Sequence, residues 1–299
     1  MKVKIVEVGP RDGLQNETEI FTLEQKIEFI SLLVKAGHRD IEAGSFVRPD
    51  KIPQMADTMD LISKLPKTSS VNFWSLVPNE RGFQDAVSCG VKSLAIFTAA
   101  SETFNEKNIN TSVDGSFERF NLFIPEARKK KIKIRGYVST AFGCPYEGNV
   151  APKSVLSVVR RLLDLGCDEI SVGDTIGVAT PLQVQKLSKS LLKLVGAKKL
   201  ALHFHDTRGT ALANILSALR EGVRIFDSSS GGIGGCPYAP GASGNVATDD
   251  LLYMLNGMGF ETGIDLQLQI KGTEYVQRIL GRKLPSKYFQ AALASHGGK

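Results

Sequence analysis

Eight short apolar runs alternate with longer amphipathic stretches, and this alternation limits the possible folds more than any other feature of the chain. The short runs are typical of buried strands, whereas the longer stretches carry apolar residues at helical spacing. Strands that alternate with helices indicate parallel βαβ units. The predicted strands are 3–8, 40–43, 71–77, 93–98, 133–139, 169–172, 200–204 and 224–228, and the helices that follow them in turn are 17–35, 54–65, 80–88, 117–130, 152–165, 181–194, 211–221 and 249–255.

Eight such units can close on themselves, so we predict an α/β fold, a (β/α)8 TIM barrel with a C-terminal helical extension. No linker interrupts the pattern, and we expect one catalytic domain over residues 1–299, with the barrel at about 3–260 and the extension at about 261–299. A helix is predicted at 266–280 within the extension. A doubly wound open sheet shows the same alternation and is the alternative. Glycines that follow predicted helices are consistent with helix ends, at Gly37, Gly90, Gly166 and Gly222.

Composition and charge exclude several classes of protein. The net charge is +6, from 37 Lys and Arg against 31 Asp and Glu, which is mild. No run approaches the ~18 apolar residues of a membrane span. The densest basic run, residues 128–131, has no interleaved aromatics, so a solvated helix end is favoured over nucleic-acid binding. An anionic small ligand stays open, with Lys107, Asn108, Lys129 and Lys130 as weak candidates.

The four cysteines are far apart and form no CxxC motif, which suits a reducing compartment and indicates neither a disulfide framework nor a zinc ribbon. The first residues, MKVKIVEVGPRDG, show neither an apolar signal segment nor an Arg/Ser-rich transit segment. We therefore expect a cytoplasmic protein that binds no membrane.

Two histidines form the sharpest local motif. Residues i and i+2 of a strand point to the same face, so His203 and His205 are expected on one side of the seventh strand. An ordinary HxH is more often a core histidine beside an exposed one, but barrels keep their chemistry at the C-terminal strand ends. We favour metal ligation, completed by Asp12 and by an Asn or Gln oxygen. This mixed N/O set suits Mg²⁺ or Mn²⁺.

Other reactive side chains follow the predicted strands. Arg11 cannot lose its proton and could stabilise an oxyanion, although a surface Arg–Asp turn is the plainer interpretation. Cys236 stands in the glycine-rich segment 231–245, which suggests an accessible acid/base thiol rather than a buried structural cysteine. A Cys–His–Asp hydrolase is a weaker alternative. Glu42 and Asp174 are equally balanced between acid/base groups and strand-end caps.

Several longer strings carry a resemblance to a known family. EVGPRDGLQNE at 7–17, GDTIGVAT at 173–180, HFHDTRG at 203–209 and GCPYAPGASGNVATDD at 235–250 closely resemble 3-hydroxy-3-methylglutaryl-CoA lyases. The HxHDT string alone is also similar to the wider metal-dependent Claisen-type barrels, which include isopropylmalate and homocitrate synthases. The cysteine-bearing string is specific to the lyases.

The resemblance implies cleavage of (S)-3-hydroxy-3-methylglutaryl-CoA (HMG-CoA) to acetyl-CoA and acetoacetate, as in leucine degradation and ketone-body formation, by a homodimer. It implies that Arg11 stabilises the enolate and that Cys236 protonates it. The divalent ion would be bound by Asp12, His203, His205 and Asn245. The proton network would include Glu42, Asp174, His203 and Asp249, and the acyl-CoA contacts would be Asn108, Tyr137 and Ser139. Asp249 stands where a Glu is common in the family.

Two alternatives stay open at this stage. A condensing synthase of the same superfamily would join acetyl-CoA to a 2-oxo acid, and a metal-binding barrel would lack activity. The cysteine-bearing string favours the lyase over the first, and the full set of reactive residues argues against the second. Specificity among close 3-hydroxy-3-methyl thioesters is not predicted.

Overall fold

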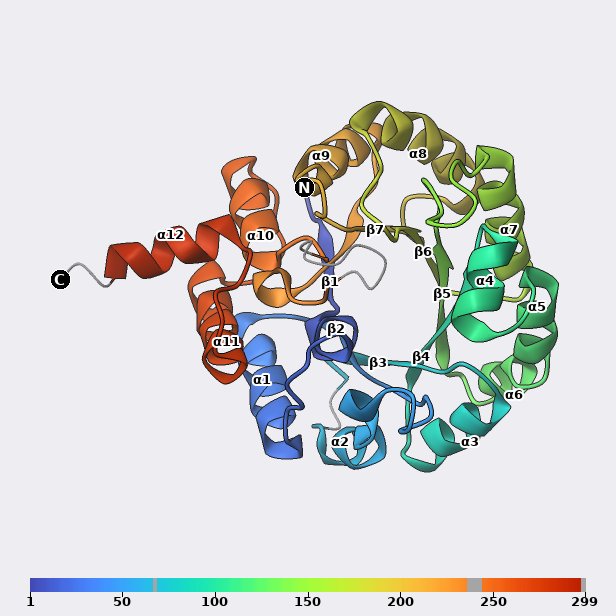
Figure 1. Ribbon diagram of the computed structural model, residues 1–299, viewed down its shortest axis with the longest axis horizontal. Helices are drawn as coiled ribbons and strands as arrows, with labels where there is room; N and C mark the ends of the chain where they lie inside the picture. The colour runs from blue at the N-terminus through green and yellow to red at the C-terminus, as the bar shows by residue number, and fades with distance from the viewer. Residues whose placement is uncertain (67–68, 236–243, 297–299) are drawn as a thin grey trace.

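The computed structural model describes residues 1–66, 69–235 and 244–296 and shows a closed barrel of eight parallel strands in sequence order (Figure 1). Pairing of β8 with β1, at Lys4 opposite Ile225, closes the barrel. The predicted barrel is therefore confirmed, and the open sheet is wrong. The strands are β1 (Lys4–Glu7), β2 (Asp40–Ser45), β3 (Asn72–Leu76), β4 (Ser93–Ala99), β5 (Lys133–Ser139), β6 (Glu169–Asp174), β7 (Leu200–Phe204) and β8 (Ile225–Ser228).

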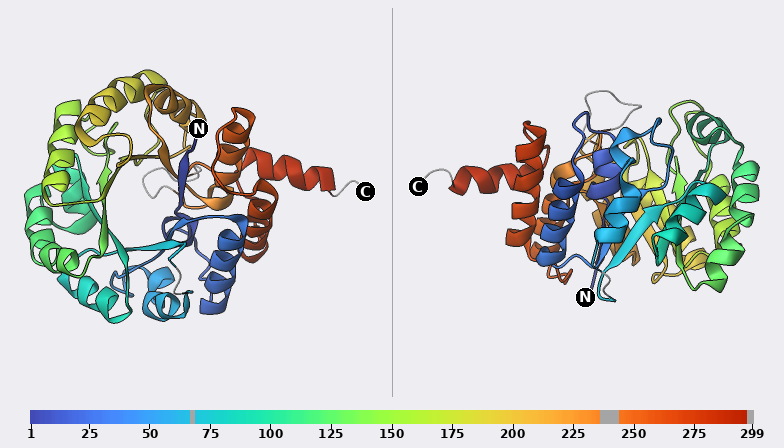
Figure 2. Two further views of the ribbon diagram at one scale, coloured as in Figure 1. Left: turned by 180° about the vertical axis from the view of Figure 1, so that it is seen from behind. Right: turned by 90° about the horizontal axis from the view of Figure 1, so that it is seen from below.

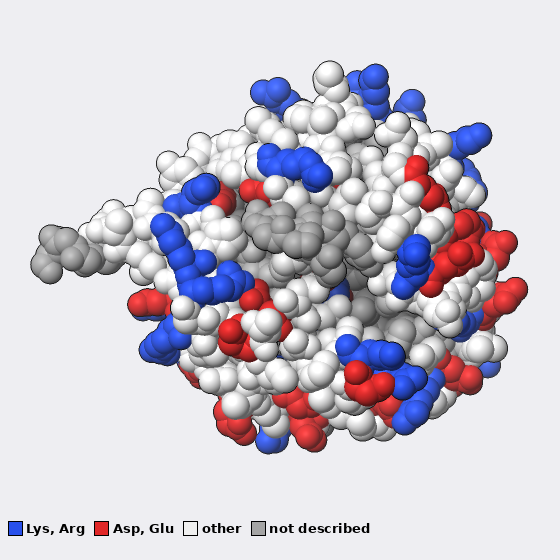
Figure 3. Space-filling model, viewed as in Figure 1, with Lys and Arg blue, Asp and Glu red and all other residues white. Residues whose placement is uncertain are grey.

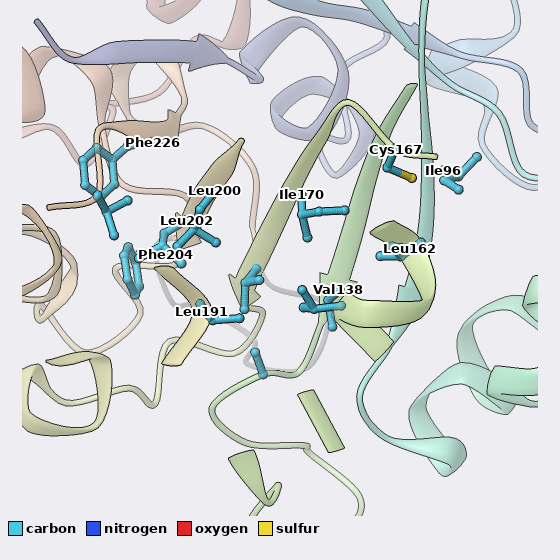
Figure 4. Packing of buried hydrophobic residues seen from close by; sticks show 14 of the residues in the cluster. Ile96, Val138, Leu162, Cys167, Ile170, Leu191, Leu200, Leu202, Phe204 and Phe226 are labelled. Carbon is cyan, nitrogen blue, oxygen red and sulfur yellow. The ribbon is translucent and has the colours of Figure 1, made fainter. Parts of the chain in front are cut away.

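Helices form a ring around the strands (Figure 1). Apolar side chains such as Ile170, Leu202 and Phe226 lie between the barrel and the helices, where Leu162 and Leu191 meet them (Figure 4). The helices are α1 (Leu23–Ala36), α2 (Thr58–Lys64), α3 (Glu80–Ser88), α4 (Glu102–Ile109), α5 (Val113–Asn121), α6 (Ile124–Lys129), α7 (Pro152–Asp164), α8 (Pro181–Val195), α9 (Ala211–Glu221) and α10 (Thr248–Gly257). All four glycines expected at helix ends have positive φ, from 79° to 111°.

The region between β4 and β5 differs from the prediction of one helix at 117–130. It contains three helices, α4, α5 and α6, and the first of these was not predicted. Ser101 and Ser112 begin α4 and α5 because each hydroxyl accepts a backbone N–H three residues ahead. Pro125 has no N–H to donate and sits in the first turn of α6, so one continuous helix is not possible here.

The first helix also starts later than the prediction of 17–35. Thr22 caps α1, and its hydroxyl accepts the N–H of Gln25 while the Gln25 side chain accepts the N–H of Thr22. This reciprocal capping box fixes the helix start at Leu23. A sequence periodicity does not reveal that boundary, because the apolar spacing begins before the backbone becomes helical.

A layer of paired charges crosses the interior of the barrel. Arg135 is fully buried and forms ion pairs with Asp227 at 2.5 Å and Glu169 at 2.9 Å. Lys4 joins Glu169 at 2.9 Å to Asp40 at 3.0 Å. We call these five residues the charged layer. Because each carboxylate in it has a cationic partner, the charges can be buried without remaining uncompensated.

The C-terminal extension contains α11 (Leu266–Leu280), as predicted, and α12 (Lys287–His296), which was not predicted. The apolar side of α11 packs with α1 residues such as Ile30 and Leu33 in one hydrophobic cluster. From that base α12 projects away from the barrel (Figures 1 and 2). None of the helices in the described ranges has the length and apolar character needed to cross a membrane.

Candidate active site

The C-terminal ends of the strands surround a cavity of about 720 Å³. The face that contains it shows Lys and Arg side chains in several separate groups (Figure 3). A single helical turn, Gly9–Gly13, follows β1 and carries two of the predicted residues into the cavity wall. The predicted residues that line the cavity are Arg11, Asp12, Asn108, Tyr137, Ser139, His203 and His205.

Three of these side chains form a candidate metal centre. One ligand atom each from Asp12, His203 and His205 lies within 4.8 Å of the others. Both imidazoles face the same side of β7 and its end, with ring centroids 5.2 Å apart, as the HxH spacing predicts. Asp12, which follows β1, comes close to the histidines at the end of β7 because β8 pairs with both β1 and β7.

Asn245 completes the cluster. A β-bridge joins it to His205, and its Nδ2 donates to Asp12 Oδ2 at 2.8 Å. Its Oδ1 is buried and has no hydrogen-bond partner among the described residues. A buried amide oxygen without a partner is costly unless a ligand occupies it, so this atom fits a fourth ligand position.

The electrostatics keep two of the candidate ligands in the forms that can bind a metal ion. Burial, with the nearby His203, lowers the pKa of His205 to about 3, so its imidazole is neutral at pH 7. Burial would raise the pKa of Asp12, but Arg11 and the histidines lower it to about 2. A neutral imidazole, a carboxylate and an amide oxygen are suitable ligands for Mg²⁺ or Mn²⁺.

Asp227 is a residue of the site that sequence reasoning missed. Its Oδ2 lies 3.3 Å from His203 Nδ1 and also accepts from Ser171 at 2.9 Å, and its Oδ1 pairs with Arg135. Burial lowers the pKa of His203, but Asp227 outweighs it and the net shift is upward. A carboxylate on the second nitrogen of a ligating histidine fixes the ring and its tautomer. The sequence did offer one indication, since Asp227 is an acidic residue inside the apolar run of β8.

Arg11 and Glu42 form a buried pair. Arg11 Nε donates to Glu42 Oε2 at 2.7 Å, and Arg11 Nη2 contacts the same oxygen at 2.5 Å. Arg11 Nη1 donates to Asp12 at 2.7 Å. These contacts raise the pKa of Arg11 despite its burial, so it remains a cation. A guanidinium has five N–H groups, and three contacts leave two for a substrate oxygen.

Three predicted members of the proton network do not line the cavity: Glu42, which pairs with Arg11, and Asp174 and Asp249. Asp174 accepts the N–H groups of Val178 and Ala179 at 2.9 and 3.0 Å and holds the turn after β6, in agreement with the strand-end interpretation. Asp249 accepts from Gly231 at 2.7 Å and from Thr273 at 2.8 Å, facing the extension. Cys236 lies outside the described residues.

The structure places the four residues proposed for an anionic ligand in different regions. Asn108 lines the cavity, but Lys107 Nζ lies 5.0 Å from the centre of the Tyr146 ring instead. Lys129 and Lys130 end α6, which leads into the start of β5 at the opposite end of the barrel, so those two were wrong. Besides Arg11, the described cations that line the cavity are Arg48, Lys51 and Arg119, which the sequence did not single out.

Comparison with known proteins places this geometry in a family. The family model described as HMGL-like matches residues 2–276. The chain belongs to the HMGL-like family. Its relatives include the mitochondrial hydroxymethylglutaryl-CoA lyases of Rattus norvegicus, 51% identical, and Homo sapiens, 49% identical, each over 97% of this chain and 89% of the relative.

Solved structures of this family have the same fold. The hydroxymethylglutaryl-CoA lyase of Pseudomonas aeruginosa superposes with a TM-score of 0.96 at 45% identity and covers 98% of both chains. The HMG-CoA lyase of Acinetobacter baumannii, in complex with coenzyme A and 3-methylmalate, has a TM-score of 0.93 at 38% identity, with 97% of this chain and 95% of that chain covered.

Proposed function

We infer that this HMGL-like chain is a carbon–carbon lyase that cleaves (S)-3-hydroxy-3-methylglutaryl-CoA to acetyl-CoA and acetoacetate, the reaction of leucine degradation and ketone-body formation. About half of its residues are identical to those of lyases named for this reaction. The observation that carries the inference is the cluster of Asp12, His203 and His205 beside Arg11 at the mouth of the barrel.

The residues that would hold a divalent ion are Asp12, His203, His205 and Asn245. The partnerless Oδ1 of Asn245 and the neutral imidazole of His205 support this ligand set. We propose Mg²⁺ or Mn²⁺, since two oxygen and two imidazole donors form a mixed set without thiolate, which suits a hard or borderline divalent ion. When bound, such an ion polarises substrate oxygen atoms and stabilises negative charge on them.

Arg11 stabilises the charge that forms during cleavage. The proton network takes the proton of the tertiary hydroxyl, the C–C bond breaks, and its electron pair remains on the acetyl thioester as an enolate. The two remaining N–H groups of Arg11 donate to the enolate oxygen. Since that charge develops mainly in the transition state, Arg11 acts on kcat more than on KM.

The enolate must receive a proton, and the residues around the proposed metal ligands must hold the reacting groups in place. Cys236 donates its proton to the enolate carbon, which gives acetyl-CoA, while the ketone of acetoacetate forms from the former alcohol. Glu42 aligns Arg11, and Asp174 and Asp249 act through the backbone segments that they hold. Tyr137, Ser139 and Asn108 contact the acyl-CoA from the cavity wall.

A direct product assay tests the function. The purified chain is incubated with HMG-CoA and Mg²⁺, and acetoacetate and acetyl-CoA are measured, with a parallel sample in EDTA. We expect both products, their loss in EDTA and their return when Mg²⁺ or Mn²⁺ is added in excess. Condensation of acetyl-CoA with 2-oxo acids, without HMG-CoA cleavage, would instead indicate a synthase, and no turnover of either would indicate a non-catalytic barrel.

The acid is tested separately with a matched pair of cysteine variants. Cys236→Ala is expected to lose most turnover and its sensitivity to thiol alkylation. Cys89→Ala, at the end of α3, is the control and should behave as the wild type. Full turnover of Cys236→Ala would exclude the thiol as the acid.

The proposal also covers the oligomeric state of the protein and its location in the cell. We propose one catalytic domain that forms a homodimer in the cytoplasm, as the resemblance implies, and a rat relative is named as a cytoplasmic lyase. Light scattering on the purified chain tests the dimer, and a monomer mass would refute it.

A further inference from the structure

The C-terminal extension contacts chain segments that lead into the wall of the candidate active site, not only the outside of the barrel. The turn η3 (Ser230–Gly232) follows β8 at the mouth. Gln269 Nε2 on α11 donates to Ser230 Oγ at 2.9 Å, and the N–H of Ser286 donates to the carbonyl of Gly231 at 3.1 Å. The extension therefore holds the chain segment that leads to residues 233–235.

Arg282 makes the strongest of these contacts. It lies between α11 and α12, and its Nη2 reaches both carboxylate oxygens of Glu17 at 2.6 and 2.7 Å. Glu17 is only 6% exposed, so its carboxylate is largely shielded from water and this ion pair compensates it. Glu17 Oε1 also accepts the backbone N–H of Gly234 at 3.3 Å, which joins the extension to the cavity wall.

Gly234 lies against two of the proposed metal ligands. A Cβ at this position would be 2.7 Å from Asn245 Nδ2 and 3.2 Å from the carbonyl oxygen of Asp12, so no side chain fits there. The neighbouring carbonyl of Ile233 accepts from the same Asn245 Nδ2 at 3.3 Å. A displacement of residues 233–234 must therefore move the Asn245 side chain.

We propose that Arg282 is a positioning residue for the metal centre. Through Glu17 it holds Gly234, and through Gly234 it holds Asn245 and Asp12 in the arrangement that binds the divalent ion. The inference rests on the proposed metal site and is independent of which thioester is the substrate. The Arg282 side chain is 45% exposed, so its replacement leaves no buried cavity.

Direct Mn²⁺ binding tests the proposal without any turnover assay. Electron paramagnetic resonance reports the free Mn²⁺ in titrations of the purified chain. Arg282→Gln is expected to weaken Mn²⁺ binding on the order of tenfold, the range seen when outer partners of metal ligands are removed. Arg282→Lys keeps a cation beside Glu17 and should retain part of the affinity.

Arg278→Gln is the matched control, because Arg278 is an exposed arginine of α11 that stacks near Tyr275 and touches neither Glu17 nor the site. It should bind Mn²⁺ as the wild type does. In Glu17→Gln the further change Arg282→Gln should add little, since both act through one contact.

The outcomes separate the two levels of inference. Equal Mn²⁺ affinity in Arg282→Gln and Arg278→Gln overturns the positioning role, as does a lower Tm with unchanged affinity. Fully additive losses in the double variant also overturn it. A wild-type chain that binds no Mn²⁺ refutes the metal site of the proposed function itself, and the role of Arg282 with it.

Discussion

The mouth of the barrel and the charged layer beneath it both contain buried polar and charged side chains. The two regions differ in the partners that these side chains have. In the charged layer, Arg135 and Lys4 have carboxylates at 2.5–3.0 Å. At the mouth, His205 Nδ1 and Asn245 Oδ1 are buried without hydrogen-bond partners among the described residues. Arg135 Nε and Glu169 Oε1 of the charged layer also make no hydrogen bond of good geometry, but they lie 2.9 Å apart as an ion pair. Opposite charges therefore compensate each other in the layer, whereas the unpartnered atoms at the mouth leave positions for a ligand.

Asp227 belongs to both regions. It pairs with Arg135 in the charged layer and contacts His203 at the mouth, so the layer fixes the orientation of a proposed metal ligand. The buried ion pair of Asp227 therefore supports both the fold and the proposed metal site. Variants that affect one region but not the other can measure how far the two are coupled.

The largest expected effect is at the mouth. Arg11→Gln removes the proposed donors to the enolate, and we expect kcat to fall by about 10²–10³-fold with a smaller change in KM. Steady-state kinetics on HMG-CoA measure both. Arg128→Gln, which removes an exposed arginine paired with Asp168, is the control for loss of a positive charge. Near-normal turnover of Arg11→Gln would exclude this role.

Glu7 differs from the carboxylates of the charged layer, because it is buried and has no cationic partner among the described residues. Within the described part of the chain, Glu7 accepts from Gly9, Ser230 and Thr248, and burial raises its pKa from 4.5 to about 7. The folded state thus holds this proton at higher pH than the unfolded chain, so the contribution of Glu7 to the free energy of unfolding should fall as pH rises from about 4.5 to 7. This pKa change corresponds to about 3 kcal/mol at most.

Glu7→Gln tests that pH dependence, because an amide has a similar shape but does not ionise. In urea unfolding between pH 4.5 and 7.5, the free energy of unfolding of the wild type should decline relative to that of the variant as pH rises. Both proteins keep the other pH-dependent groups, since burial raises the pKa of Asp249 to about 6 and lowers that of His38 to about 4. Parallel curves for the two proteins would contradict the assignment to Glu7.

Asp227→Asn tests the coupling between the regions. We expect Mn²⁺ binding to weaken by about 10–100-fold, because the variant disturbs the orientation of His203, together with a loss of stability from Arg135. Titration of Mn²⁺ and urea unfolding measure the two effects. Unchanged Mn²⁺ affinity would mean that the contact between Asp227 and His203 has no positioning role.

Glu169→Gln is the smallest change and the control for Asp227→Asn. Glu169 also pairs with Arg135, but its ion pairs, to Arg135 and Lys4, both lie in the charged layer. Since both cations keep another carboxylate, we expect a loss of about 1.5 kcal/mol in the free energy of unfolding. Mn²⁺ affinity and kcat should be unchanged, and a marked loss of Mn²⁺ affinity would show that the whole layer positions the metal centre.

Much of the architecture could be predicted from sequence because it depends on local periodicity. Side-chain alternation in strands placed His203 and His205 on one face, and the order of eight units placed Asp12 two strands away from them. The helix ends at Gly37 and Gly222 were also local, since positive φ favours glycine. The division of 117–130 was missed because Pro125 and the Ser112 cap, not apolar spacing, determine it.

By itself, the sequence determined the barrel, the family and the residues that meet at its mouth, because these depend on spacing along the chain. Only the tertiary structure decided which polar atoms have partners. The contact from Asp227 to His203 spans 24 residues, and that from Arg282 to Glu17 spans 265. Such contacts depend on how strands and helices pack in three dimensions, and packing determines which carboxylate orients a ligand and which arginine holds the wall of the site.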